Sequence, residues 1–289
     1  MPRWIKIAIK SFLVLLVIII VAFLGVAYYV NTNKKTLLVA VTKQLNLNLN
    51  GKLTIGSMDP TLLKGFPGVS LRLNNVLIQD DKWLQHHRTL LDAKDFNVSV
   101  NTLALLRGTV QIKKVEISNA TIYLYTDSNG YSNTSVFKKK ERSKPAADDG
   151  DDSSTELKKF ALNNVNFVVD NQKGHKLFQF DIKELKGNMD YPSEGWKADF
   201  KLKTLVKSLA FNTRRGSFIQ NQLLEGPFSV AYNNDTEVIT VAPNTLNIGK
   251  DPFVIGARFG IGKDPVEFEI NISAKEFYGV ALLHCWHQI

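Results

Sequence analysis

The sequence predicts a mainly β protein with one N-terminal transmembrane helix, followed by an elongated, curved antiparallel sheet with few short helices. Three observations lead to this fold class: a long uncharged apolar run near the N-terminus, apolar and polar residues that alternate over most of the remaining chain, and one charged stretch that lacks large apolar side chains.

The transmembrane helix is predicted within residues 1–33, because no charged residue occurs between Lys10 and Lys34. Its 23 uncharged residues span about 35 Å as a helix, and a bilayer core is about 30 Å thick. The expected membrane-anchor residues are Phe12, Leu16, Ile20, Leu24, Tyr28 and Tyr29. Basic residues flank both ends, and we expect the N-terminus inside and the bulk of the chain exported. A cleaved signal peptide ending near Gly25-Val26-Ala27 is the alternative.

The positive charge of the chain is concentrated beside this helix. The net charge is +9 over 289 residues, and residues 1–35 carry five basic residues and no acid. The rest is only mildly basic, which argues against a nucleic-acid partner. The single cysteine excludes an internal disulfide.

Residues 34–137 are expected to form a β domain that begins with a short amphipathic helix over Lys35–Leu47. Strict alternation then predicts strands with one apolar face, as in Val69–Asn74 and Phe96–Asn101. The aspartate–proline pairs Asp59-Pro60, Asp251-Pro252 and Asp264-Pro265 predict turns. Residues 138–156 predict a charged flexible linker or loop. A second β-rich segment, residues 157–275, is expected to continue the sheet, and residues 276–289 form an atypical tail.

A weak repeat places a polar pair containing asparagine inside several strand patterns. It occurs at Asn74-Asn75, Ser118-Asn119 and Asn163-Asn164. Because asparagine tolerates left-handed or bulged backbone, each pair is expected to bend a strand or turn a corner.

No residues suggest catalysis, a cofactor or a metal site, so the chain is not expected to be an enzyme. His86-His87 are interpreted as a surface loop. His284, Cys285 and His287 are close in sequence but form only a weak metal pattern.

Several segments together resemble the N-terminal part of the AsmA family of envelope proteins. They are the anchor with its following helix, Leu49–Gly56, Gly65–Leu71, Leu91–Val100, Leu103–Ile112 and Asp127–Asn133. From Glu156 the pattern is similar to Bacteroidetes-type members. The final tail departs from the family pattern, so we expect a truncated or frame-shifted member.

The resemblance implies a Gram-negative inner-membrane protein with a single pass, a cytoplasmic N-terminus and a periplasmic β-rich body. It also implies that the curved sheet forms an open groove or a taco-like shape, whose apolar face binds or conducts phospholipid in support of outer-membrane assembly. Expected partners are the inner membrane, phospholipid and outer-membrane or envelope assembly proteins; no cofactor is implied. The lipid-groove candidates are Val69, Leu71, Leu73, Phe96, Val98, Val100, Val110, Ile112, Phe178, Phe180, Ile182, Val266, Phe268 and Ile270.

Three alternatives remain open from the sequence. The same alternation is typical of a dry β-sandwich core. The chain could instead be an anchored periplasmic scaffold that binds partner proteins by strand addition, without lipid transfer. A periplasmic binding module for glycans or peptides is a further alternative.

Overall fold

The computed structural model describes residues 32, 35, 38–39, 42–43, 46, 49–61, 69–101, 112–137, 157–260 and 267–274. Over these residues, no helix has the length and apolar content needed to cross a bilayer. The predicted anchor residues Phe12 to Tyr29 lie outside the described residues, as do the linker 138–156 and the tail 276–289. Where residues of the predicted helix Lys35–Leu47 are described, they are helical.

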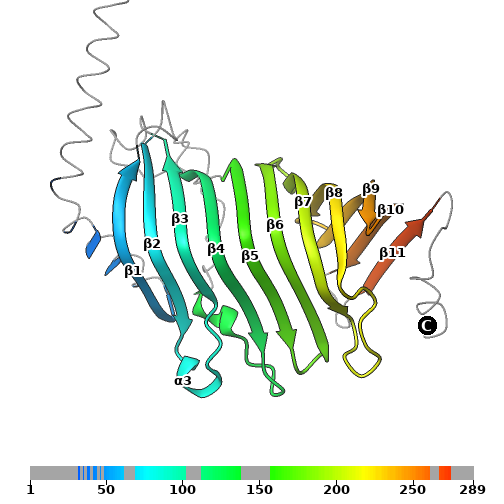
Figure 1. The fold of residues 1–289 in the computed structure, drawn as a ribbon, viewed down its shortest axis with the longest axis horizontal. Helices are drawn as coiled ribbons and strands as arrows, with labels where there is room; N and C mark the ends of the chain where they lie inside the picture. Colours follow the sequence, from blue (N-terminus) through cyan, green and yellow to red (C-terminus); the bar gives the residue numbers. More distant parts are fainter. Residues whose placement is uncertain are drawn as a thin grey trace, which may run out of the picture.

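The fold is one curved eleven-stranded sheet whose strands lie in sequence order (Figure 1). The strands are β1 (Gly51–Thr61), β2 (Val69–Asp80), β3 (Leu91–Val100), β4 (Ile112–Thr126), β5 (Lys159–Asn171), β6 (Lys176–Asp190), β7 (Gly195–Ala210), β8 (Gln222–Asn233), β9 (Val238–Ile248), β10 (Asp251–Gly260) and β11 (Glu267–Ser273). Two short helical elements, α3 (Trp83–His86) and η1 (Asn133–Val136), lie in the connections. The predicted mainly β fold with one long sheet is therefore confirmed.

Every neighbouring pair of strands is antiparallel except β4 and β5, which are parallel. The expectation of an antiparallel sheet is wrong at this pair. An antiparallel neighbour can follow a tight hairpin, but a parallel neighbour requires the chain to return to the starting end of the previous strand. Residues 127–158 make that return, and η1 lies at its beginning.

The strands follow from alternation of apolar and polar side chains, and β7 shows this most regularly. Ala198, Thr204 and Val206 are buried on one face. Lys197 and Asp199, which flank Ala198 in the sequence, are exposed. Two of the three Asp-Pro turn predictions are wrong, and the third pair, Asp264-Pro265, lies outside the described residues. Asp59-Pro60 lies within β1, at the edge of the described sheet, and Asp251-Pro252 begins β10. Proline is tolerated at both places because an edge or a strand start needs no donor from it.

The asparagine repeat shifts the alternation of side chains by one residue inside a continuous strand, rather than forming a corner between two strands. We call this one-residue shift the slip. Asn75, Asn119 and Asn164 have φ of 53°, 53° and 52°, in the left-handed region. β2, β4 and β5 each continue through this residue. Across the slip, apolar residues are three positions apart instead of two, as in Leu73 and Val76. The predicted left-handed backbone is thus confirmed and the predicted corner is wrong, whereas bending of the strands stays a prediction.

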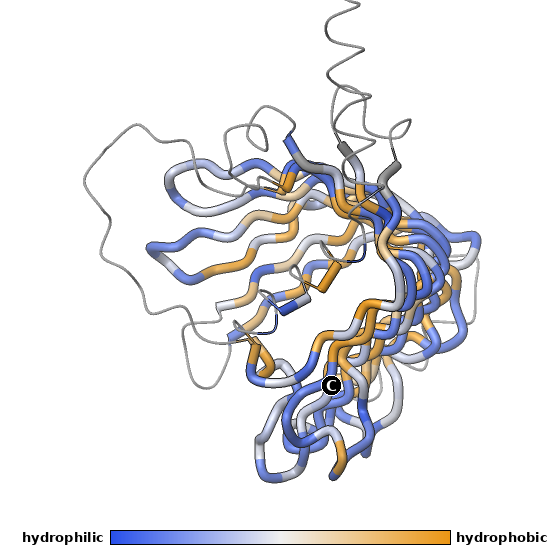
Figure 2. The backbone as a smooth tube through the Cα atoms, turned by 90° about the vertical axis from the view of Figure 1, so that its left-hand side faces the viewer, coloured by the Kyte–Doolittle hydropathy of each residue, from blue (hydrophilic) through white to orange (hydrophobic). Residues whose placement is uncertain are grey.

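No second layer packs on the sheet within the described part of the chain. There, extensive contacts join only strands adjacent in the sheet, together with η1 against β2 and β4. A dry sandwich core, which needs two facing sheets, is not formed by the described strands. Viewed from the β1 end, the strands trace a curved wall along which hydrophobic and hydrophilic residues are interspersed (Figure 2).

Candidate functional site

The most extensive apolar surface is one face of the sheet, on which side chains from successive strands align in rows. Residues paired directly across neighbouring strands point to the same face, so the strand register defines each row. We name these rows A to D and refer to them together as the apolar face. Row A contains Leu71, Val98, Val115, Phe160, Gly187 and Phe200; row B contains Leu73, Phe96, Ile117, Leu162, Leu185 and Leu202; row C contains Val76, Ala93, Ala120, Val165, Ile182 and Thr204; row D contains Ile78, Leu91, Ile122, Phe167, Phe180 and Val206.

Row C forms the buried centre of the apolar face. Its residues are small or β-branched, and Ala93, Val165 and Thr204 are at most 1% exposed. Rows B and D flank it with larger side chains that pack against this centre. Most members of rows A, B and D are only partly buried. Partial exposure of so many large apolar side chains is unusual for a soluble protein and marks a ligand or partner surface.

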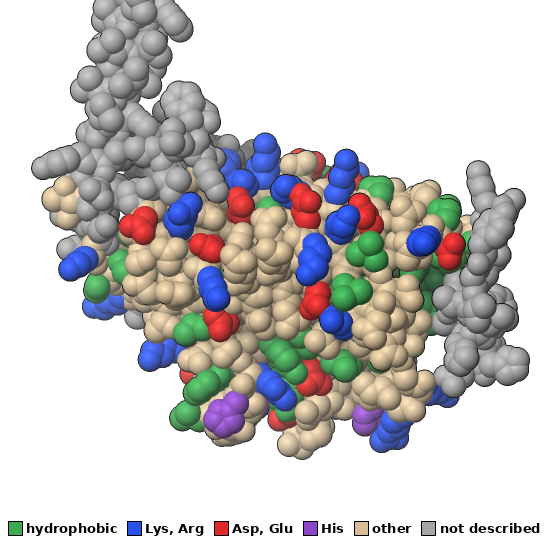
Figure 3. All heavy atoms as spheres, viewed as in Figure 1, with side chains coloured by type: hydrophobic (Ala, Val, Ile, Leu, Met, Phe, Trp, Pro, Cys, Tyr) green, Lys and Arg blue, Asp and Glu red, His purple; other side chains and the backbone are tan. Residues whose placement is uncertain are grey.

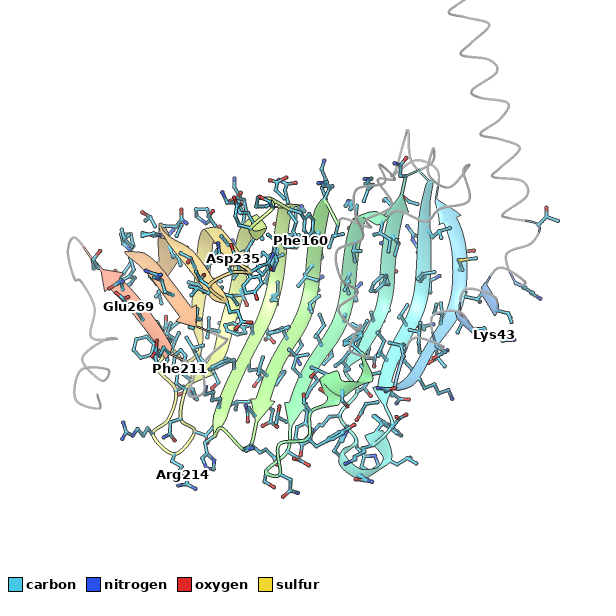
Figure 4. All side chains as sticks on the ribbon, turned by 180° about the vertical axis from the view of Figure 1, so that it is seen from behind. Lys43, Phe160, Phe211, Arg214, Asp235 and Glu269 are labelled. Carbon is cyan, nitrogen blue, oxygen red and sulfur yellow. The ribbon has the colours of Figure 1, made fainter. Side chains whose placement is uncertain are left out.

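Aromatic rings extend this surface toward the C-terminal strands. Phe200 lies between Phe160 and Phe228, with ring centroids 6.1 Å and 5.2 Å apart. Phe211 follows β7, and the centroid of its ring lies 5.2 Å from that of Phe178 and 6.1 Å from that of Phe268 in β11. Phe160 and Phe211 are labelled in Figure 4, which views the sheet from behind. The rings thus connect β5 to β8 and β6 to β11.

The predicted groove residues divide by position in the sheet. Leu71, Leu73, Phe96, Val98, Phe180 and Ile182 belong to rows A to D, and Phe178 lies on the same face two residues before Phe180. Ile112 pairs with Val100 at the start of β4. Val69 pairs with Val100, but the structure does not describe these two side chains. Phe268 and Ile270 are exposed on β11, whereas Val110 and Val266 lie outside the described residues.

Sequence reasoning missed much of the apolar face on β4 and β5. Ile117, Ala120, Leu162 and Val165 belong to rows B and C. Alternation alone does not connect them because each pair is separated by three positions. The repeated spacing across the asparagine pair was the signal that would have joined the two halves of each strand.

The opposite face of the sheet, which we call the polar face, carries interspersed acidic and basic side chains (Figure 3). One of its rows contains Asp92, Thr121, Asn166 and Asp181. Lys207 of β7 lies 3.4 Å from the carboxylate of Asp181. A mixed surface of this kind keeps one face of the sheet hydrated while the other remains apolar.

A separate buried polar cluster fixes η1 against the ends of β2 and β4. The carboxylate of Asp80 accepts one hydrogen bond from the Tyr131 hydroxyl, and its Oδ2 lies 3.0 Å from His86 Nε2. The Asn133 amide accepts from the Tyr125 backbone N–H and donates to the Tyr123 carbonyl. The surface-loop interpretation is therefore wrong for His86, the last residue of α3, whose side chain is 9% exposed. These contacts are explained by packing of the return segment.

The described residues contain no group of three or more His, Cys, Asp or Glu side chains positioned to hold a metal ion. His284, Cys285 and His287 lie outside them. The apolar face is therefore the arrangement with a clear physical use: it can cover hydrocarbon while the polar face stays in water.

Comparison with known protein families identifies the family of the chain. The profile of the AsmA family matches residues 1–240, which include the predicted anchor and the strands from β1 into β9. Comparisons with curated proteins and with solved structures gave no significant match. Because the family match covers most of the chain, the chain belongs to the AsmA family.

Proposed function

We propose that this protein is anchored in the inner membrane and supports outer-membrane assembly by binding or conducting phospholipid along the apolar face in the periplasm. The observation that carries the proposal is the set of four aligned apolar rows, which no second layer covers within the described residues. Membership of an envelope-associated family supports it. The role needs no catalytic residue.

The direction of the rows suits a hydrocarbon chain. They run across the strands, along the length of the sheet from β2 to β7. Neighbouring strands are about 4.8 Å apart, so an acyl chain lying along a row contacts a new apolar side chain at each strand. Each methylene removed from water contributes about 0.8 kcal/mol. Since successive positions along a row are chemically similar, a chain can advance without crossing a polar barrier.

The test is photo-crosslinking of the full chain in membranes, with a photoreactive phenylalanine analogue at Phe180 or, as a matched control, at Gln179. Phe180 belongs to row D, and Gln179 precedes it on the opposite face of β6. Phospholipid should be captured at position 180 and not at 179. Equal capture at both positions, or none at 180, would contradict lipid binding by the apolar face.

A substitution adds a second readout. Phe180→Asp should reduce co-purifying phospholipid at least several-fold, because a carboxylate in row D is costly to desolvate. Gln179→Asp should leave the lipid content unchanged. Thermal unfolding of both variants separates lost lipid binding from lost folding, and the crosslinking result decides the matter if Phe180→Asp unfolds.

The second candidate function, an anchored scaffold that binds proteins by strand addition, is favoured by β11. All seven residues of this strand are exposed, and in the described sheet β11 pairs only with β10. Edge strands of this kind accept added strands. A photoreactive residue at Asn271 that captures proteins, combined with absence of lipid at position 180, would favour the scaffold.

A further inference from the structure

One edge of the sheet, formed by the connections that follow β2, β4, β5, β7 and β9, is basic. These connections lie along the lower margin of Figure 1, and their described parts are residues 81–90, 127–137, 172–175, 211–221 and 249–250. Their basic residues are Lys82, Arg88, Lys173, Arg214, Arg215 and Lys250, and their acidic residues are Asp81 and Asp127, a net charge of +4. We call this edge the basic rim. The two hairpin connections described at the opposite edge, residues 191–194 and 234–237, contain Glu194, Asp235 and Glu237 but no basic residue.

The positive charge of the basic rim is densest where two connections touch. Lys173 of the β5–β6 connection and Arg214 and Arg215 of the β7–β8 connection are all exposed. The Thr213 backbone N–H donates to the His175 carbonyl at 2.7 Å, which holds the two connections side by side. Arg214 projects from the tip of the longer one (Figure 4). Neither of these two fully described connections contains an acidic residue, so an approaching anion meets no carboxylate within them.

An exposed leucine lies on the same rim, in the β2–β3 connection. Leu84 is 76% exposed, and no residue of its helix α3 is buried. Trp83 fixes the connection, because its indole N–H donates to the Thr89 hydroxyl at 3.0 Å. Lys82 and Arg88 lie on either side of Leu84 in the sequence and are exposed. An apolar side chain held out between basic residues is typical of segments that insert at the headgroup boundary of a bilayer.

The spread of these groups suits an extended anionic surface and not a small anion. The β2–β3 and β7–β8 connections are five strand spacings apart in the sheet, about 24 Å. Cations so far apart cannot converge on one phosphate, whereas a layer of anionic headgroups attracts all of them at once. A bilayer also offers Leu84 an apolar layer beneath the headgroups, which the phosphate backbone of a nucleic acid does not.

We propose that the basic rim docks on the surface of an anionic phospholipid bilayer, with Leu84 inserted at the headgroup boundary and Lys173 and Arg214 beside the headgroup phosphates. Row D is the apolar row nearest to this edge, since its member Ile78 lies two residues before the end of β2. Docking therefore brings one side of the apolar face next to the bilayer. It does not depend on lipid binding by the apolar face, because its contacts come from the connections alone.

The experiment is photo-crosslinking of the full chain in vesicles of phosphatidylcholine, alone or mixed with anionic phosphatidylglycerol. A photoreactive phenylalanine analogue replaces Leu84 or, as the matched control, Tyr191, an exposed aromatic residue at the opposite edge. Because the predicted anchor would bring both edges to the vesicle, the difference between the two positions reports docking. In the anionic vesicles, position 84 should capture phospholipid at least threefold more than position 191. In the neutral vesicles, capture at position 84 should fall at least threefold.

Charge reversal gives a second comparison. Lys173→Glu combined with Arg214→Glu should lower phospholipid capture at position 84 at least threefold. Lys197→Glu combined with Lys201→Glu, at exposed positions of β7 outside the rim, changes the net charge equally and should leave capture unchanged. All four side chains are exposed, so the unfolding temperature should stay the same; if a variant unfolds, the two positions and the two kinds of vesicle still decide.

Four results would overturn the proposal. They are equal phospholipid capture at positions 84 and 191, equal capture at position 84 in neutral and anionic vesicles, equal effects of the two charge reversals, and capture of protein instead of phospholipid at position 84.

Discussion

The left-handed asparagines should be needed for the stability of the sheet, and Asn75 and Asn164 provide the clearest test. Both side chains are exposed, so replacement by alanine removes little buried surface. An ordinary residue in this backbone region costs about 1–2 kcal/mol, which asparagine partly avoids. Asn75→Ala and Asn164→Ala should therefore each lower the free energy of unfolding by about 1 kcal/mol.

The two effects should add in the double variant. Asn75 and Asn164 lie on β2 and β5, which two strands separate, so they are about 14 Å apart and share no neighbour. Independent sites at this distance are additive within about 0.5 kcal/mol. A loss of about 2 kcal/mol in a β domain of this size lowers the unfolding temperature by about 4–8 °C.

The assay is thermal unfolding of the full chain in detergent, followed by circular dichroism. The glycine double variant at the same positions is the control, because glycine adopts positive φ without steric cost. Glycine should be clearly more stable than alanine. If the alanine double variant unfolds at the same temperature as the glycine double variant or higher, the left-handed backbone does not set the slip and the reasoning fails.

Two further predictions concern packing and pH. Gly187→Ala should destabilise the protein by about 1–3 kcal/mol through overpacking, since an added Cβ would lie 2.5 Å from the Cβ of Phe200 and 2.7 Å from Phe160. Gly260→Ala, whose nearest contact is 3.8 Å away, should leave the unfolding temperature unchanged; equal effects at both glycines would contradict this account. Burial, followed by the hydrogen bond it donates to Asp170, raises the pKa of Tyr123 from 10.0 to about 12. The folded state then holds this proton more tightly than the unfolded state does. The contribution of the Tyr123 hydroxyl to the free energy of unfolding is therefore full below pH 10 and is lost as the pH rises toward 12. In that pH window, the free energy of unfolding measured with denaturant should decline less steeply for Tyr123→Phe than for the unmodified chain. Parallel pH profiles of the two proteins would refute the assignment.

The strands were predictable because they form a single-layered sheet, in which each strand has one apolar side and one hydrated side. Alternation of period two therefore survives in Leu71–Leu73 and Phe178–Phe180, and the sequence located both pairs on strands. It failed at Ile117 and Ala120, where Asn119 shifts the phase by one residue and a single strand reads as two. The alternation of apolar and polar residues within one strand does not reveal this shift, which becomes visible only when neighbouring strands are compared.

The alignment of residues in rows on the polar face and the parallel pair of strands could not be predicted from the sequence. Asp92 and Asp181 are far apart in the chain, and only the register across β3 to β6 places them in one row. Similarly, the charged composition of residues 138–156 predicts solvation, but it does not fix the end of the sheet to which the chain returns.

The parallel pairing of β4 with β5 has a consequence for the order of folding. The pairings from β1 to β4 and from β5 to β11 join strands that follow each other closely in the chain. Such local contacts form quickly, whereas β4 and β5 meet only after the chain between them, residues 127–158, has brought their ends together. Each half can thus assemble by adding hairpins from its own start, and the joining of the two halves becomes the slow, entropy-limited step. Shortening or lengthening this connection should change the folding rate more than it changes the finished sheet.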